Sequence, residues 1–370
     1  MIIMNCNFRP VNSGEVMNIL NIVGAKIWGG AEQYVYDIDE ELLSRHIETV
    51  VLVDETNTEM QKKYSHVAEV WTADLYRCKG FMSLKAVAKK AKERCIDTIQ
   101  CHSGKYILFC IALKKMTGAR LIFYKHNPVP AKHDLYHSWV QKHVDDFICV
   151  SEFVRNLLLD ERTPYPEKYH LVYNGINLRR FKLENIKREA GNDCFTVGFA
   201  ARLKKVKGLY VLLDAVRKMH DDYPEIKLVI AGAGTPEQIT KLRSVIKEYN
   251  MNSYVTYIGF QDDMMRFYSR IDCLVLPSIM LEAFGLVICE AMYCEVPVIT
   301  SNTGAQPEII EHKKTGYLLP EVTPGAIETA ILYMYDHKNE LPAMGKRGRE
   351  CVLERFTLKR VCDQILTVLE

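Results

Sequence analysis

The sequence has no apolar run long enough to cross a bilayer. Its longest apolar stretches, such as Tyr106 to Leu113, fall well short of the ~20 residues that a membrane-spanning helix needs. The segment Met1 to Val16 is polar and lacks the apolar core of a signal peptide. We therefore expect a cytoplasmic chain. The net charge of only +2 creates no overall field that would recruit nucleic acid.

Two sequence signatures are also missing. The chain has 12 cysteines but no Cys-x-x-Cys pair, and Cys6, Cys78, Cys101 and Cys110 are scattered, so no zinc site is predicted. A disulfide framework belongs to small secreted domains, so cysteines inside apolar runs are expected to be reduced core residues. These are Cys110, Cys149, Cys273 and Cys289. No Gly-x-Gly-x-x-Gly occurs, which argues against a nicotinamide oxidoreductase.

The length and composition indicate a globular protein of two domains. The chain has 370 residues, 48% hydrophobic and 25% charged, which fits two domains of ~150–200 residues. In the first half, apolar runs alternate with amphipathic segments, as in a parallel sheet covered on both faces by helices. Strands are predicted over Met17–Val23, Glu48–Val53, Asp97–Cys101, Arg120–Tyr124 and Phe147–Val150, and helices over Glu32–Ser44 and Leu84–Arg94.

The alternation pauses between Asn174 and Asp193, where we place the domain linker. It restarts with strands predicted over Phe195–Ala200, Ile226–Ala231, Val255–Ile258, Cys273–Pro277, Pro297–Thr300 and Gly316–Leu319, and a helix over Gly208–Met219. The expected fold is α/β, with two doubly wound Rossmann-like domains at 1–180 and 194–350. Residues 351–370 form a further helix that is expected to return to the first domain. Ligands of such sheets bind beyond the carboxyl ends of the strands.

The most informative stretch runs from Asp272 to Met292. A strand ends at Pro277, a loop carries Glu282, and a helix begins near Gly285 and carries Glu290. The free N–H groups at a helix start, here around Phe284, Gly285 and Leu286, can bind a phosphate. Glu290 stands among apolar residues and needs a partner, for which sugar hydroxyls are suitable. Taken singly, Glu282 could equally be a helix cap and Glu290 the partner of a structural arginine.

Two other segments follow predicted strands. Arg202 and Lys207 follow the strand that ends at Ala200, and two cations there suit a diphosphate that gains negative charge as it leaves. The alternative is a solvated basic loop. Gly29 and Gly30 open a helix after the first strand and would allow a ligand close to the backbone.

Two histidines, His102 and His126, each end a strand predicted in the first domain. Both could point into a cleft, although a lone histidine is more often structural. His126 is the better functional candidate, because Asn127-Pro128 turns the chain directly after it.

Together these motifs resemble the retaining glycosyltransferases of family 4, which have the GT-B fold. The resemblance covers nearly the whole chain and is most specific where Glu282 and Glu290 stand eight residues apart. The motifs that carry it are Gly29-Gly30-Ala31-Glu32, Asn174-Gly175-Ile176-Asn177, Arg202 with Lys207-Gly208, Pro277-Ser278, Glu282-Ala-Phe-Gly285, Glu290-Ala-Met292, Pro297-Val298-Ile299, Gly304, Pro307-Glu308-Ile309-Ile310 and Thr315-Gly316-Tyr317.

The resemblance implies a role for each site residue. Arg202 and Lys207 should hold the donor diphosphate, Glu290 the ribose, and Glu282 the donor sugar. Gly30, beside Gly29, should approach the diphosphate, and His126 should line the reacting face of the sugar. The backbone at Phe284, Gly285 and Leu286 and the turn at Gly259 should complete the donor site. The first domain should bind the acceptor, a glycan or a lipid-linked molecule.

Four positions depart from the family pattern: Ala201, Glu295 and Ala305 replace glycines, and Asn177 replaces an aspartate. None removes a proposed ligand contact, although Ala305 could alter donor choice. The sequence identifies no carboxylate beneath the anomeric carbon, as double displacement would require. We therefore favour a front-face route in which the leaving diphosphate helps to deprotonate the acceptor. Because two cations stabilise the leaving group, we expect no metal and no other cofactor.

Rival functions remain on the same architecture: a nucleotide-sugar epimerase, a sugar phosphorylase, or a nucleotide-binding protein without catalysis. Peripheral contact with the inner face of the membrane also stays open, since the basic face of Leu84–Arg94, with Lys114 and Lys115, could meet anionic headgroups. The expected role is in cell-surface polysaccharide or lipopolysaccharide synthesis. The base, the donor sugar and the acceptor depend on loop shapes that the sequence does not reveal.

Overall fold

The structure is a computed structural model that describes residues 17–24, 28–75, 80–181 and 194–369. The polar N-terminal stretch, Cys6, Cys78 and the linker residues 182–193 lie outside these described residues. The chain divides into two compact units. Unit 1 comprises Met1–Asn174 together with Leu358–Glu370, and unit 2 comprises Gly175–Thr357. Each unit is described here by itself.

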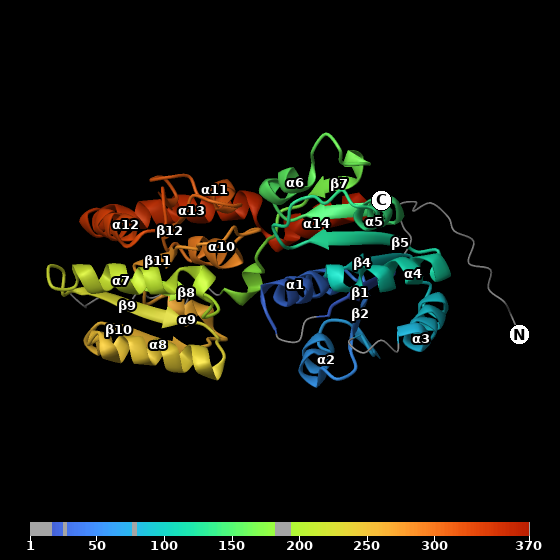
Figure 1. The fold of residues 1–370 in the computed structure, drawn as a ribbon, viewed down its shortest axis with the longest axis horizontal. Coiled ribbons are helices and arrows are strands. Elements are labelled where there is room, and N and C mark those ends of the chain that lie inside the picture. The colour runs from blue at the N-terminus through green and yellow to red at the C-terminus, as the bar shows by residue number, and fades with distance from the viewer. Residues whose placement is uncertain (1–16, 25–27, 76–79, 182–193, 370) are drawn as a thin grey trace, which may run out of the picture. The chain divides into compact units, whose positions relative to one another are not determined.

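Unit 1 is built on a parallel sheet of seven strands in the order β3-β2-β1-β4-β5-β6-β7 (Figure 1). The strands are β1 Ile19–Ile22, β2 Thr49–Asp54, β3 Glu69–Ala73, β4 Thr98–Cys101, β5 Arg120–Lys125, β6 Asp146–Cys149 and β7 Tyr169–Leu171. Every residue of β1, β2, β4 and β6 is buried, as expected for parallel strands covered on both faces. The chain reverses its direction of growth between β1 and β4, so this is the switch point of the sheet.

The helices of unit 1 are α1 Gly30–Ser44, α2 Thr58–Tyr64, α3 Gly80–Glu93, α4 Ile107–Thr117, α5 Leu135–His143, α6 Glu152–Leu158 and α14 Leu358–Leu369. The last of these, α14, packs against α1. Arg45 at the end of α1 forms an ion pair of 2.6 Å with Asp363, and the Arg120 guanidinium donates to the carbonyl of Leu369 at 2.8 Å. The helix at the end of the chain thus belongs to the first unit.

Unit 2 contains a parallel sheet of six strands in the order β10-β9-β8-β11-β12-β13. The strands are β8 Phe195–Ala200, β9 Ile226–Ala231, β10 Val255–Gly259, β11 Cys273–Leu276, β12 Val298–Ser301 and β13 Gly316–Leu319. Here the switch point lies between β8 and β11, because β9 and β10 add on one side and β12 and β13 on the other.

The helices of unit 2 are α7 Leu209–Met219, α8 Pro236–Glu248, α9 Met264–Tyr268, α10 Leu286–Tyr293, α11 Gln306–Ile309, α12 Pro324–Asp336 and α13 Leu341–Arg355. Among them α10 packs on α13 and α7 on α12. Within the described part of the chain, no helix combines the length and the apolar character needed to cross a membrane. The two doubly wound units with parallel sheets confirm the predicted fold class.

Candidate functional site

The switch point of unit 2 gathers the residues that follow β8 and β11. The loop after β8 ends in a short 3-10 turn, Lys205–Lys207, before α7. Gly208 joins this turn to α7 with a φ of +76°, and a Cβ there would lie 1.9 Å from the carbonyl oxygen of Pro277. Because only glycine fits so close a contact, Gly208 lets the two loops meet.

Lys207, Glu282 and Ser278 form one polar cluster across these loops. The Lys207 ammonium lies 2.5 Å from Glu282 Oε1, and the Ser278 hydroxyl donates to the same oxygen at 2.5 Å. Ser278 is buried, and its backbone carbonyl accepts a bond from the Ser301 hydroxyl at 2.8 Å. The carboxylate of Glu282 is therefore held at a fixed point above the end of β11, with a cation beside it.

The backbone of Glu282 is fixed from the other side by Gly304 and Ala305. The N–H of Ala305 donates to the Glu282 carbonyl at 3.0 Å. Gly304 has a φ of +62°, and a Cβ there would lie 2.5 Å from the same carbonyl oxygen. The loop after β12 thus supports the loop that carries Glu282.

Arg202 occupies the loop after β8 and is exposed. Within the described residues its guanidinium has no ion pair and no hydrogen bond. Its charge is thus available to an anion at the end of β8, whereas that of Lys207 is shared with Glu282.

The start of α10 has no side-chain cap, as is also true of α7, α11 and α13 in unit 2. Thr235 caps α8 and Thr323 caps α12 through their hydroxyls, whereas α10 follows Gly285, which has a φ of +153°. Among the described residues, no hydrogen bond uses the N–H groups of Gly285, Leu286 or Val287. Such a helix start can bind an anion through its N–H groups and its dipole. Phe284 is buried, with its ring 5.5 Å from that of Phe356, and anchors this turn.

Glu290 lies one turn into α10 and is buried. Its Oε2 accepts a hydrogen bond of 3.0 Å from the Tyr268 hydroxyl, and its Oε1 is 3.9 Å from the Arg180 guanidinium. Burial, followed by the nearby Glu290 charge, raises the pKa of Tyr268. The carboxylate therefore has two partners from the chain itself. The contact with Arg180 matches the alternative in which Glu290 pairs with a structural arginine, although a separation of 3.9 Å makes this a weak ion pair.

Gly259 ends β10 with a φ of +77° and open space around its Cα. Its carbonyl accepts a bond of 2.8 Å from the N–H of Gly232. The next residue, Phe260, is 60% exposed. An exposed aromatic ring on a turn at the strand's carboxyl end can stack against a planar ligand.

In unit 1, the loop after β1 leads to Gly29 and Gly30. Gly29 precedes α1 in an extended conformation without a side-chain cap, and a Cβ at Gly30 would meet nothing within 4 Å. The two glycines thus leave room beside the helix start at the second switch point.

A chain of hydrogen bonds connects His126 to the interior of unit 1. His126 Nε2 lies 3.2 Å from His102 Nδ1, and His102 Nε2 lies 3.0 Å from Asn21 Oδ1. Asn21 Nδ2 in turn donates to Asp39 Oδ1 at 2.8 Å. Because an amide oxygen only accepts, His102 carries its proton on Nε2, and His126 donates from its own Nε2 to His102 Nδ1. This leaves His126 Nδ1 as an acceptor for a ligand.

Burial keeps the titratable groups of this hydrogen-bond network, Asp39, His102 and His126, in their uncharged forms. It lowers the pKa of His126 to about 4 and, together with His126, that of His102 well below its usual range. It raises the pKa of Asp39 to about 8, although hydrogen bonds from Thr49 and Asn21 oppose it. Both imidazoles are neutral at pH 7. No group of three or more His, Cys, Asp or Glu side chains among the described residues is arranged to hold a metal ion.

Several residues of these clusters are not predicted by the sequence patterns. Ser278 belongs to the Pro277-Ser278 motif, and a hydroxyl four residues before Glu282 is the one local signal of their contact. Tyr268 and Arg180 reach Glu290 from α9 and from the turn Leu178–Arg180, and no local pattern links them to it. Asn21 lies within a strand that is otherwise apolar, and the sequence does not indicate its contacts with His102 and Asp39.

Comparisons with known proteins give matches over both units. Residues 182–351 match the family described as Glycosyl transferases group 1, and residues 28–180 match Glycosyltransferase Family 4. Spore coat protein SA of Bacillus subtilis is 26% identical over 375 residues, which cover 92% of this chain and 95% of that protein. The N-acetyl-alpha-D-glucosaminyl L-malate synthase of Bacillus anthracis is 35% identical over 208 residues, which cover 53% of this chain and 52% of that enzyme.

Solved structures share the fold. Anabaena HepE in complex with UDP and glucose superimposes with a TM-score of 0.80 at 20% identity, covering 95% of this chain and 99% of that one. At this identity the structural similarity establishes only the fold, which is GT-B. The two matching family descriptions together extend from residue 28 to residue 351, and polar loops lie at the switch points of both sheets. The chain therefore belongs to the family 4 glycosyltransferases and is an enzyme of that class.

Proposed function

We propose that this enzyme transfers a hexose-type sugar, with retention of anomeric configuration, from a UDP- or GDP-linked donor to a glycan or lipid-linked acceptor. The observation that carries the proposal is the cluster of Lys207, Glu282 and Ser278 beside the uncapped start of α10. It combines a cation, free N–H groups and a fixed carboxylate. These are the groups that a diphosphate joined to a sugar requires.

Each group has a proposed role. Arg202, Lys207 and the N–H groups at Gly285 and Leu286 bind the diphosphate. Glu290 accepts hydrogen bonds from ribose hydroxyls, and Tyr268 holds its carboxylate in place. The remaining donor contacts come from Glu282 to the sugar, Phe284 through its backbone, Gly259 near the base, Gly29 and Gly30 near the diphosphate, and His126 at the reacting face of the sugar.

The proposed route is a front-face displacement. The bond from the anomeric carbon to the diphosphate oxygen breaks, and the acceptor oxygen bonds to the same face. The departing diphosphate takes the proton of the acceptor hydroxyl. Arg202, Lys207 and the start of α10 stabilise the negative charge of the leaving group, which is the largest kind of contribution at such sites. Because these groups supply the positive charge, the reaction needs no metal and no other cofactor.

The comparisons support a nucleotide-sugar donor without fixing its identity. The Anabaena protein binds UDP and glucose in its crystals, and the Bacillus anthracis relative is named for an α-D-glucosaminyl product. A role in cell-surface polysaccharide or lipopolysaccharide synthesis fits relatives such as the capsular polysaccharide glycosyltransferase CapM of Staphylococcus aureus. Thermal shift measurements with UDP and GDP would identify the base, because a ligand well above its Kd raises stability by several kcal/mol.

The decisive experiment is product analysis by NMR together with three variants. Arg202→Ala and Lys207→Ala should each lower kcat by about 10²–10³-fold, the cost of removing one charge-stabilising group. Lys204→Ala is the matched control, since Lys204 is an exposed cation of the same loop, and it should leave kcat within twofold. An inverted linkage would exclude the front-face route. Unchanged turnover in Lys207→Ala, or loss of activity with EDTA, would remove the roles assigned to these cations.

A donor-only assay separates transfer from its rivals. An epimerase would convert the nucleotide sugar without an acceptor, whereas a transferase should release at most a slow hydrolysis product. Peripheral membrane contact is also part of the proposal. Helix α3 presents exposed Lys85, Lys89, Lys90 and Lys92, but Lys114 is held by Asp145 at 2.6 Å. Flotation with anionic vesicles tests this contact.

A further inference from the structure

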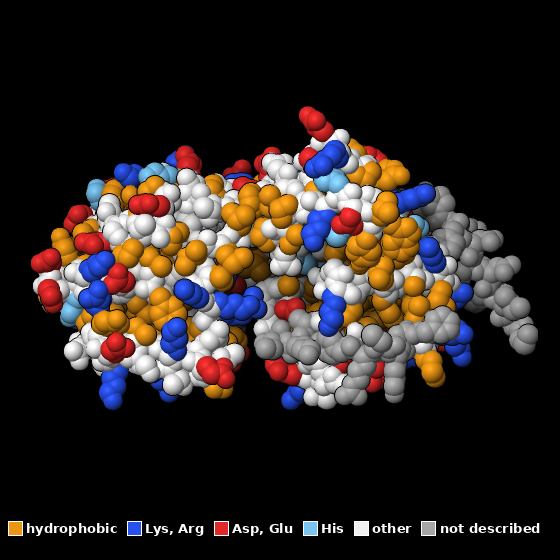
Figure 2. Space-filling view, viewed as in Figure 1, with side chains coloured by type: hydrophobic (Ala, Val, Ile, Leu, Met, Phe, Trp, Pro, Cys, Tyr) orange, Lys and Arg blue, Asp and Glu red, His pale blue; other side chains and the backbone are white. Residues whose placement is uncertain are grey.

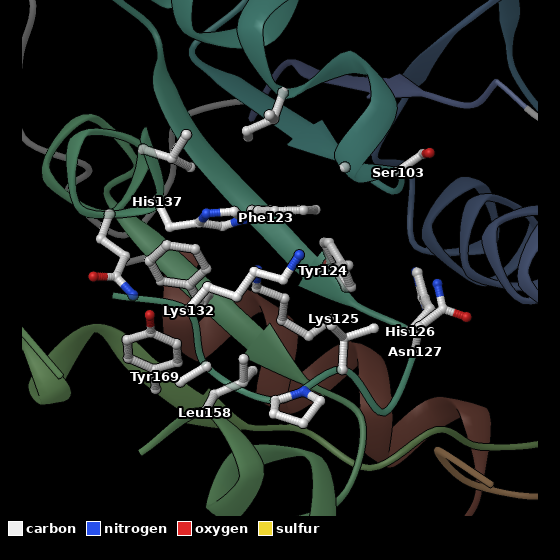
Figure 3. A pocket seen from close by; sticks show the side chains of 18 of the residues that line it. Ser103, Phe123, Tyr124, Lys125, His126, Asn127, Lys132, His137, Leu158 and Tyr169 are labelled. Atoms are coloured by element: carbon white, nitrogen blue, oxygen red, sulfur yellow. The ribbon is translucent and has the colours of Figure 1, made fainter. Parts of the chain in front are cut away.

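Unit 1 contains a cavity of about 240 Å³ beside β5, which contributes Phe123, Tyr124 and Lys125 to the lining (Figure 3). The other walls come from Phe147 of β6, Tyr169 at the start of β7, Leu158 of α6, the segment between β5 and α5, and α5 itself. The His102 and His126 pair lies on one side of it. The described residues that line the cavity all belong to unit 1, and His102, His126 and Asn127 among them follow the carboxyl ends of β4 and β5, where parallel sheets bind ligands.

Among the described residues, the charged side chains that line this cavity are all basic. They are Lys125 and Lys132, together with the imidazole of His137, and no aspartate or glutamate of the described segments lines it. The His137 imidazole is already paired with Asp134, whose Oδ2 lies 2.7 Å away. Within the described residues neither lysine has an ion pair or a hydrogen bond to its ammonium group. The cavity therefore carries positive charge that the chain does not neutralise.

Lys125 is the more unusual of the two lysines. It ends β5, and its ammonium lies 4.0 Å from the ring centroid of Phe123 and 5.1 Å from that of Phe147. Burial lowers the pKa of Lys125 to about 8. An ammonium with only aromatic faces as partners is poorly compensated for the water that it has lost. An anion in the cavity would supply the missing partner.

The rest of the lining is largely apolar, and the apolar surface continues outside. Ile107, Phe123, Val140, Phe147 and Leu158 line the interior. Val129 and Tyr136, which also line the cavity, are 50% and 45% exposed, and neighbouring Leu135 is 92% exposed. Figure 2 shows hydrophobic side chains gathered over the region of α5. A contiguous exposed apolar patch of this kind marks a binding surface more often than isolated exposed residues do.

We propose that this cavity binds the acceptor, and that the acceptor joins an anionic group, a phosphate or a carboxylate, to an apolar chain. The naming of the ligand as the acceptor rests on the proposed glycosyl transfer. The anionic group pairs with Lys125 and with Lys132 at the entrance. The apolar chain lies along Tyr136, Val129 and Leu135. His126, which lines the same cavity, stands beside the bound molecule.

Isothermal titration of the full chain, without a donor, tests the proposal with three probes. Octyl phosphate combines both features, inorganic phosphate has only the charge, and octyl glucoside has only the chain. We expect octyl phosphate, kept below its critical micelle concentration, to bind at least tenfold more tightly than either of the others. Equal binding of octyl phosphate and octyl glucoside would overturn the proposal, as would equal binding of octyl phosphate and inorganic phosphate.

Variants connect the binding to this cavity. Lys125→Met should weaken octyl phosphate binding at least tenfold, and Lys125→Arg should keep it within about threefold. Lys62→Met is the matched control, because Lys62 is an exposed lysine on α2 of the same unit. Lys125→Met should also leave the melting temperature unchanged or higher, since it removes a half-buried cation that has neither an ion pair nor a hydrogen bond among the described residues. If Lys125→Met folds and binds octyl phosphate as tightly as Lys62→Met does, the proposed site is wrong.

An experiment with vesicles identifies the source of the amphiphile. Flotation with phosphatidylglycerol vesicles that depends on Lys125 indicates a lipid drawn from the bilayer. Octyl phosphate binding without such flotation indicates a free amphiphilic anion, and both results support the proposed chemistry. A separate titration with UDP compares the unchanged protein with the Lys207→Ala variant and reports on the donor site in unit 2. Failure of the acceptor proposal and failure of the proposed transfer would thus be seen in different titrations.

Discussion

Asp39 should make the stability of unit 1 fall as the pH rises, and Asp39→Asn should abolish this fall. The carboxyl group is completely buried in α1 and bonds to Asn21. Burial raises its pKa from 3.8 to about 8, so the folded chain keeps a proton that the unfolded chain releases above pH 4. The folded state therefore binds more protons across this window, and its stability decreases with pH. The substituted asparagine is neutral at every pH and still offers an oxygen to Asn21.

The size of the effect follows from the two pKa values. Each pH unit between them costs about 1.4 kcal/mol for one proton. By pH 7 the total reaches about 4 kcal/mol, a large part of the 5–15 kcal/mol that stabilises a typical domain. His126 acts in the opposite direction at lower pH, because its pKa of about 4 in the folded chain lies below the usual value and acid favours unfolding. Above pH 6.5 the His126 imidazole is neutral in both the folded and the unfolded chain, so it no longer makes the stability depend on pH.

Urea unfolding between pH 6 and 8 provides the measurement. Tryptophan fluorescence reports on unit 1, because Trp28, Trp71 and Trp139 all lie in it. The stability gained by Asp39→Asn should grow by about 2 kcal/mol from pH 6 to pH 8. Glu161→Gln, at an exposed position of the same unit, should show no such growth. A gain that is the same at both pH values would refute the assignment of a protonated Asp39.

Two further substitutions test the support of the donor site. Gly304→Ala should lower the free energy of unfolding by about 1–3 kcal/mol, because it combines a positive φ with a Cβ 2.5 Å from the Glu282 carbonyl oxygen. Thermal unfolding measures this loss. Gly325→Ala is the control and should not lower the stability of the protein, because a Cβ there meets nothing within 4 Å. Tyr268→Phe removes the hydrogen bond of 3.0 Å to Glu290 and should weaken binding of the donor nucleotide about three- to tenfold, as measured by titration; unchanged affinity would show that Tyr268 does not position this carboxylate.

The alternation of apolar and amphipathic segments predicted the central strands closely. Phe195–Ala200 and Ile226–Ala231 coincide with β8 and β9, because strands covered on both faces are continuously apolar. The two strands of unit 1 without a prediction, β3 and β7, are the two edges of its sheet. β3 includes Glu69 and Thr72 as exposed residues, and β7 has only three residues. Edge strands have one neighbour and more contact with water, so their apolar signal is weak.

The sequence by itself determined the class of the fold and the loops that carry the chemistry. These features depend on local periodicity and on residues that follow strands, which the chain order contains. The partners inside each site were decided only by tertiary structure. Lys207 meets Glu282, 75 residues away, and His102 meets Asn21, 81 residues away, because parallel crossovers bring the ends of distant strands together. The environment of Lys125 was also decided by the structure, since only packing shows that its ammonium lies beside two phenyl rings and that no carboxylate of the described residues lines its cavity.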